Sequence, residues 1–87
     1  MIQGAIAAAL REAKGAARMS NRVIAAASGI TLVSVQRYLA GTREPGVSDL
    51  IRLASALGVQ ATDVIRRAQE LAERAEGTGR APWADRH

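Results

Sequence analysis

Cysteine is absent from the 87-residue sequence, which excludes disulfide bonds and cysteine-ligated metals and gives no indication of secretion. Phenylalanine is also absent, and aromatic residues make up only 2% of the chain. The N-terminus lacks the pattern of a signal peptide, and no apolar run reaches the roughly 18 residues that a membrane span needs. We therefore expect one cytoplasmic domain of about four or five short helices, from a bacterium or a bacteriophage, with no membrane partner.

The sequence also lacks the residues of an active site. It has no nucleophile beside a base, no glycine loop that cradles phosphate, and no paired carboxylates on a regular element. The single histidine, His87, is the last residue of the chain, so we expect no metal site around it. We predict that the protein is not an enzyme and uses no cofactor.

Charge is distributed unevenly along the chain, whose formal net charge is +4. Residues 1–61 hold seven basic and three acidic side chains, whereas residues 62–87 hold five of each. Arginine predominates in the basic part, and its planar guanidinium group is well suited to binding phosphate. A net charge of this size is common on ordinary domains, so alone it favours a nucleic-acid partner only mildly.

Apolar residues recur at helical spacing in five segments, and none of the chain alternates as a half-buried strand would. Abundant alanine favours thin helices packed closely together. We predict an all-α fold with helices over residues 2–14, 21–28, 32–40, 47–57 and 62–76. Residues 1–76 would form the domain, and residues 77–87 a flexible tail.

The ends of these helices are predicted from capping residues. Ser20, Thr31 and Thr62 stand where an N-cap hydroxyl can accept a free backbone N–H. Glycines follow the first four helices, although Ala16 and Ala17 offer a way to extend the first helix past Gly15. The expected core then consists of Ile2, Ile6, Ala9, Leu10, Ala13, Val23 or Ile24, Ala27, Val35, Val47, Leu50, Ile51, Leu53, Ala54, Leu57, Val64, Ile65 and Ala68.

Residues 21–40 have the pattern of a helix-turn-helix, which consists of two short helices joined by a tight turn. Small Ala25 lies where the helices would cross, Gly29 occupies the turn, and apolar Ile30 follows it. Val35 would lock the second helix against the body of the domain, leaving its outer face free. Tyr38 is expected at the edge of the core with its hydroxyl in water.

The run MSNRVIAAASGITLVSVQRYLAGTREPGVSDLIRLASALGV resembles the helix-turn-helix of the lambda-repressor/Cro superfamily (XRE-like), and is most similar to a small phage Cro protein or short repressor. The resemblance extends from Leu10 to about Ile65. It implies a five-helix domain that places its third helix in the major groove of double-stranded DNA. It further implies a repressor that occupies operator DNA in the cytoplasm of a bacterial host.

The resemblance also assigns residues to the interface. The family reads bases with the start of the third helix, which here corresponds to Leu32, Val33, Ser34 and Arg37. It contacts the DNA backbone at positions that correspond to Asn21, Gln36, Thr42 and Arg43. The chemistry agrees, because arginine can form two hydrogen bonds with guanine, and aliphatic side chains contact the methyl group of thymine. We therefore predict thymines beneath the first turn of this helix and a guanine beneath Arg37.

Several alternatives stay open at this point. The apolar stripe that continues through Leu71, Ala72 and Ala75 has two possible partners, the first helix and a second subunit. A homodimer on DNA is expected, since this motif usually binds two half-sites. The role of Trp83 in the tail is undecided. A rival function is an antitoxin-like or adaptor protein, in which Leu32 and Val33 pack on another protein.

Overall fold

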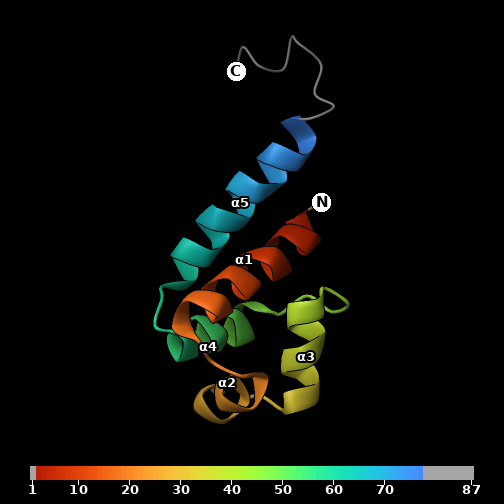
Figure 1. Cartoon of the computed structure of the whole chain (residues 1–87). Helices are drawn as coiled ribbons and strands as arrows, with labels where there is room; N and C mark the ends of the chain where they lie inside the picture. Colours follow the sequence, from red (N-terminus) through yellow and green to blue (C-terminus); the bar gives the residue numbers. More distant parts are fainter. Residues whose placement is uncertain (1, 78–87) are drawn as a thin grey trace.

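The computed structural model describes residues 2–77, which form five α-helices and, within that range, no strand. Their bounds are α1 Ile2–Ala17, α2 Asn21–Ser28, α3 Leu32–Ala40, α4 Val47–Leu57 and α5 Ala61–Gly77 (Figure 1). The all-α class predicted from the sequence is therefore confirmed. The predicted tail lies outside the described residues, except for Gly77, which is the last residue of α5.

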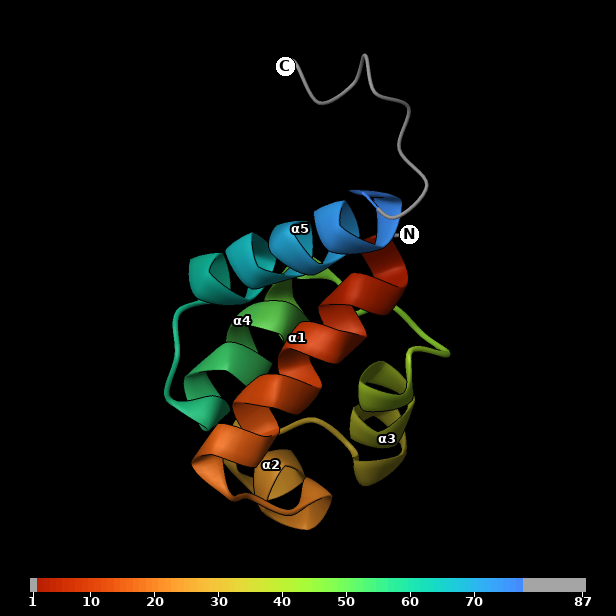
Figure 2. The same ribbon diagram turned by 45° about the horizontal axis from the view of Figure 1, so that its top comes forward.

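Helices α1 and α5 lie side by side and antiparallel, with the start of α1 next to the end of α5 (Figures 1 and 2). On α5, Val64 and Ala68 are buried, and Leu71 and Ala72 pack against the core. The apolar stripe of α5 is thus covered by the chain itself, as one of the two alternatives predicted. Ala75, at the end of the stripe, is exposed.

The centre of the core is filled by one side chain from each of the first four helices. Leu10, Ile24, Val35 and Leu53 have at most 1% of their surface exposed. Because all four are aliphatic and fully enclosed, their burial is the main favourable term that orients these helices around one another. Of the two candidates on α2, the structure buries Ile24 and leaves Val23 exposed.

Four residues predicted to be buried are exposed instead. On α4, Val47 and Ile51 are 76% and 54% exposed, and on α5 Ile65 is 42% exposed. Ala27 on α2 is exposed as well. The predictions are wrong because an apolar stripe read from sequence was wider than the face that neighbouring helices cover. On α4 that face runs through Leu50, Leu53, Ala54 and Leu57.

Helix α1 continues three residues beyond the predicted end at Lys14, through Gly15 to Ala17. Alanine propagates a helix well, so Ala16 and Ala17 extend it past the glycine. The chain reverses at Arg18, whose φ of +56° makes it the one non-glycine residue with positive φ among those described. Its N–H donates to the carbonyl oxygen of Gly15 over 3.2 Å.

Helix α5 begins at Ala61, one residue before the predicted cap. Thr62 therefore lies inside the first turn, where it is exposed. A side chain inside the helix caps its start instead: the N–H of Gln60 donates to Oδ2 of Asp63 over 3.3 Å. An acidic side chain in the first turn also complements the helix dipole.

Candidate nucleic-acid interface

Helices α2 and α3 form a compact corner, with a change of direction of 117° between them. The turn is made by Gly29, whose φ of +74° lies in the left-handed region that glycine adopts without strain. Both helices have the predicted caps: Oγ of Ser20 accepts from the Val23 N–H, and Oγ1 of Thr31 from the Ser34 N–H, each over 3.2 Å. The angle and the turn are those of a helix-turn-helix.

One side of α3 is anchored in the core and the other faces outward. Val35, Tyr38 and Leu39 are buried, which confirms the anchoring role predicted for Val35. The opposite side exposes Val33, Gln36, Arg37 and Ala40. In the ribbon views α3 lies at the edge of the molecule, remote from α5 (Figures 1 and 2).

The four predicted base-reading residues differ in how exposed they are. Val33 and Arg37, one helical turn apart, are exposed on the outer side of α3, and Val33 is 55% exposed. Leu32 and Ser34 are partly buried. The outward surface at the start of α3 is therefore centred on Val33, with Leu32 beside it.

The C-terminal half of α3 is fixed to two other helices. Nη1 of Arg11 on α1 donates to the carbonyl oxygen of Leu39 over 2.6 Å. The hydroxyl of Tyr38 donates to Oδ2 of Asp49 on α4 over 2.5 Å, so the prediction that this hydroxyl lies in water is wrong. The hydrogen bond to the carboxylate, with burial, raises the pKa of Tyr38. These bonds hold the outer face of α3 in one orientation.

Sequence reasoning missed Arg11 and Asp49 as residues that position α3. Arg11 is 28 residues from its partner and Asp49 is 11 residues from its partner, so neither contact follows from helical periodicity. The weak sequence indication is Asp49 itself, an acidic side chain in the first turn of α4. Its partner was not predictable without the path of the chain.

The loop after α3 is held against that helix. Both the N–H and the hydroxyl of Thr42 donate to the carbonyl oxygen of Arg37, over 3.1 and 3.3 Å. The guanidinium carbon of Arg43 lies 5.6 Å from the centre of the Tyr38 ring, a cation–π distance. Thr42 and Arg43 are thus placed at the C-terminal end of α3, at the edge of its exposed face.

Asn21 lies at the first position of α2 and is partly buried. Its Oδ1 is the one buried side-chain polar atom among the described residues that has no hydrogen-bond partner. Buried polar atoms in proteins nearly always have a partner; Oδ1 is an acceptor, so water can satisfy it, whereas only the Nδ2 amide group of Asn21 can donate to a phosphate oxygen. Gln36, on the outer side of α3, is exposed.

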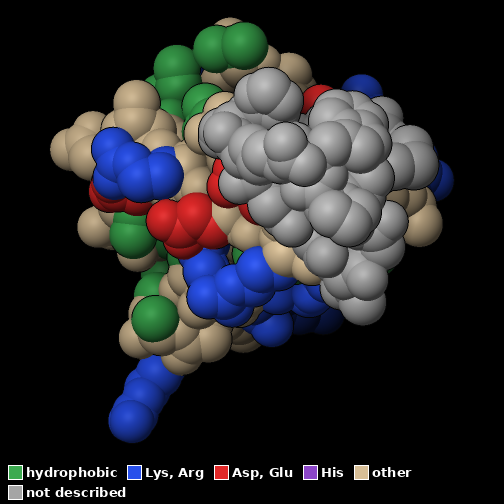
Figure 3. All heavy atoms as spheres, turned by 90° about the horizontal axis from the view of Figure 1, so that it is seen from above, with side chains coloured by type: hydrophobic (Ala, Val, Ile, Leu, Met, Phe, Trp, Pro, Cys, Tyr) green, Lys and Arg blue, Asp and Glu red, His purple; other side chains and the backbone are tan. Residues whose placement is uncertain are grey.

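Positive charge is concentrated on the helix-turn-helix and its flanks. Between Glu12 and Glu44 the chain carries no acidic residue and five basic ones: Lys14, Arg18, Arg22, Arg37 and Arg43. The opposite end of the molecule is mixed, with acidic side chains next to Lys and Arg side chains (Figure 3). There the arginines of α5 form ion pairs, such as that of Arg66 with Asp63 at 3.3 Å.

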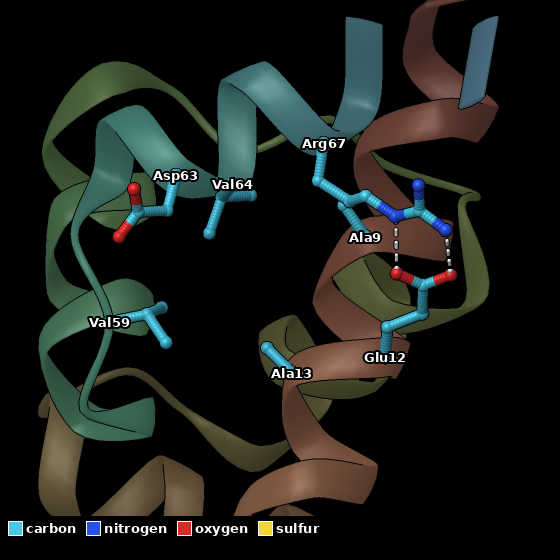
Figure 4. Close-up of a pocket in the computed structure, with 7 residues that line it drawn as sticks. All are labelled: Ala9, Glu12, Ala13, Val59, Asp63, Val64 and Arg67. Atoms are coloured by element: carbon cyan, nitrogen blue, oxygen red, sulfur yellow. Dashed lines mark hydrogen bonds and ion pairs between the residues drawn. The ribbon is translucent and has the colours of Figure 1, made fainter. Parts of the chain in front are cut away.

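A pocket of about 250 Å³ lies between α1, α5 and the turn before α5, away from α3 (Figure 4). Apolar side chains from these elements line most of it, and an ion pair closes one side. There Nε and Nη2 of Arg67 donate to the two carboxylate oxygens of Glu12 over 2.7 and 3.1 Å. Within residues 2–77, no three His, Cys, Asp or Glu side chains cluster as metal ligands would.

Comparisons with known proteins agree with this geometry. The profile of the helix-turn-helix family HTH_3 matches residues 8–64, and the chain belongs to this family. No curated protein sequence matches the chain. Nor is any single helix of residues 2–77 long and apolar enough to cross a membrane.

Two solved crystal structures resemble the whole domain. Both are of the clp gene regulator ClgR from Corynebacterium glutamicum. One is 26% identical, with a TM-score of 0.75, and the match covers 80% of this chain and 91% of ClgR. The other is 25% identical, with a TM-score of 0.78, and the match covers 92% and 88%. The shared fold therefore includes α5 as well as the part that the family profile matches.

Proposed function

We propose that this protein is a transcriptional repressor that binds double-stranded operator DNA with α3 in the major groove. The observation that carries the proposal is that α3 combines a free outer face, a fixed orientation and a basic surrounding sequence. Its outer face is free and held in one orientation by Arg11 and Asp49, and it lies in a stretch with five basic residues and no acidic one. Family membership and the likeness to a gene regulator support DNA binding.

The proposed contacts are divided between bases and backbone. Arg37 pairs with guanine in the major groove, and Val33 and Leu32 lie against thymine methyl groups. Ser34 contributes a hydroxyl near the same bases. The phosphates are held by side chains around this face, namely Asn21, Gln36, Thr42 and Arg43.

We further propose that two copies bind one operator. A single short recognition helix supplies few base contacts, and this motif commonly binds half-sites about one turn of DNA apart. Because α5 is already packed on α1, its stripe is not free for a partner. Outside the helix-turn-helix, the large apolar side chains that the structure describes as exposed are Val47, Ile51 and Ile65, and Ile51 also lines a hollow with Val59 and Ala61. Sedimentation with and without operator duplex tests the stoichiometry.

The rival function is a protein-binding module, and exposed Val23 and Val33 are the observation that favours it. Salt dependence separates the two functions, because binding to phosphates releases counterions and weakens steeply as salt rises. A repressor acting on operators in the bacterial cytoplasm would show this dependence. An apolar protein interface would not.

The test is selection of bound sequences from a randomised pool of duplexes, followed by titration of the selected duplex at several salt concentrations. We expect a two-fold symmetric site and an affinity that falls as salt rises. Arg37→Ala removes a positive charge from α3, and Arg66→Ala on α5 is its matched control. No enrichment of any sequence at low ionic strength would overturn the proposal.

A further inference from the structure

The first turn of α3 presents methyl groups at its outermost point. Val33 is 55% exposed there, and Leu32 lies partly buried beside it. The neighbouring hydroxyl oxygen of Thr31 accepts the Ser34 N–H over 3.2 Å and so caps the helix. The side chain of Val33 itself can make an apolar contact but no hydrogen bond.

This limits what Val33 can distinguish on a pyrimidine. In the major groove thymine presents O4 and a C5 methyl group, whereas cytosine presents an N4 amino group and no methyl group. An aliphatic side chain bonds to neither O4 nor N4. The methyl group is then the only feature that Val33 can detect, and 5-methylcytosine carries the same group at the same ring position.

We propose that Val33 recognises a pyrimidine by its C5 methyl group, so that methylation of cytosine at this position of the operator strengthens binding. The inference rests on the proposed function, since it needs α3 in the major groove. It adds a regulatory property: DNA methylation would convert a weak site into a strong one. Arg37, one turn further along the same face, would keep its guanine regardless of methylation.

The expected size follows from the burial of one methyl group. Removing a methyl group from water contributes about 0.8 kcal/mol, which corresponds to about a four-fold change in affinity. If two subunits each contact one methyl group, the effect on the operator is about sixteen-fold. Both values are readily measured by fluorescence anisotropy.

The experiment uses the full chain and a selected operator. The pyrimidine contacted by Val33 is identified first, as the position where selection with Val33→Ala loses its preference. Four duplexes then carry thymine, deoxyuridine, cytosine or 5-methylcytosine there, each with its matching purine. Deoxyuridine removes only the methyl group, and 5-methylcytosine restores it on the other pyrimidine.

For the wild type we expect deoxyuridine to bind about four-fold more weakly than thymine, and 5-methylcytosine about four-fold more tightly than cytosine. Val33→Ala should abolish both differences. Val23→Ala is the matched control, because Val23 is 50% exposed on α2 and should leave both differences intact. Both substitutions are at exposed sites, so melting temperatures should stay close to that of the wild type.

Two results would overturn the inference: equal affinity for thymine and deoxyuridine, or equal affinity for cytosine and 5-methylcytosine. Either would leave the proposed function standing if the selected duplex still binds with a steep salt dependence. If no duplex binds at low salt, the proposed function itself is wrong, and the two failures are thereby distinguished.

Discussion

The hydroxyl of Tyr38 donates a hydrogen bond to Oδ2 of Asp49 over 2.5 Å, and this contact ties α3 to α4. Tyr38 is only 3% exposed, so its ring packs in the core while its oxygen reaches the first turn of α4. Asp49 also lies 4.0 Å from Nη1 of Arg52. The position of the exposed face of α3 thus depends on a polar contact made on the inner side of the same helix.

Tyr38→Phe should lower the free energy of unfolding by about 1.5 kcal/mol, because it removes a buried hydrogen bond to a charged group and leaves the ring in place. Urea denaturation followed by circular dichroism measures the change. Ser48→Ala, at an exposed position beside Asp49, is the control and should have little effect. An unchanged midpoint for Tyr38→Phe would show that the contact contributes nothing.

The raised pKa of Tyr38 predicts that the stability of the fold depends on pH in the alkaline range. The pKa of Tyr38 is raised by its hydrogen bond to Asp49, above the ordinary value of about 10 in the unfolded chain. A raised pKa stabilises the fold below pH 10, and this contribution is lost as the pH rises through the pKa of the folded state. The stability advantage of the wild type over Tyr38→Phe should therefore shrink above about pH 10.

A constant difference between the two proteins from pH 8 to 11 would contradict this expectation. The comparison isolates Tyr38, because the two proteins are otherwise identical and Tyr38 is the one tyrosine of the sequence.

The lowered pKa of Glu12 predicts a contribution to stability that is lost as the pH falls, in the acidic range. Its hydrogen bonds with Arg67 lower the pKa of Glu12 below 4.5. A lowered pKa stabilises the fold above the unfolded value and ceases to do so as the pH falls through the folded value. The difference in stability between wild type and Glu12→Gln should be present at neutral pH, small because the pair is exposed, and absent at strongly acidic pH.

Glu44→Gln, in the exposed loop after α3, is the matched control for the loss of one carboxylate. Should Glu12→Gln differ from the wild type equally at neutral and strongly acidic pH, the contribution of Glu12 would not come from its charge.

Arg18→Gly should stabilise the fold by about 0.5 to 1 kcal/mol, since Arg18 has a φ of +56° that glycine adopts more easily. Urea denaturation again gives the change, and Arg18→Ala should show no such gain. Because Arg18 belongs to the basic stretch, both variants should bind DNA slightly more weakly, with a smaller salt slope. A less stable Arg18→Gly protein would contradict the conformational explanation.

Local rules predicted the helix-turn-helix well. The caps at Ser20 and Thr31 and the turn at Gly29 depend only on residues within a few positions, so the sequence defines them. Of the two ends that the sequence left open for α1, the structure has the later one, and an arginine there adopts the left-handed conformation usually given to glycine. No local rule favours Arg18 over Gly15 for that role.

Which apolar side chains are buried, and how α3 is anchored, depends on packing between helices that the sequence does not show. Ile51 and Leu50 are adjacent and equally apolar, but only Leu50 is buried in the core. The anchors of α3, Arg11 and Asp49, come from distant segments. The candidate interface could therefore be located from sequence, whereas its split into exposed Val33 and Arg37 and partly buried Leu32 and Ser34 required the structure.

The most direct test of DNA reading by α3 is the affinity of the selected duplex for wild type, Arg37→Ala and Arg66→Ala, measured with the guanine beneath Arg37 present and replaced by adenine. The replacement should cost the wild type and Arg66→Ala about 1 to 3 kcal/mol and cost Arg37→Ala almost nothing, because the guanine is read by Arg37. The same cost for all three proteins would contradict the placement of α3 in the major groove.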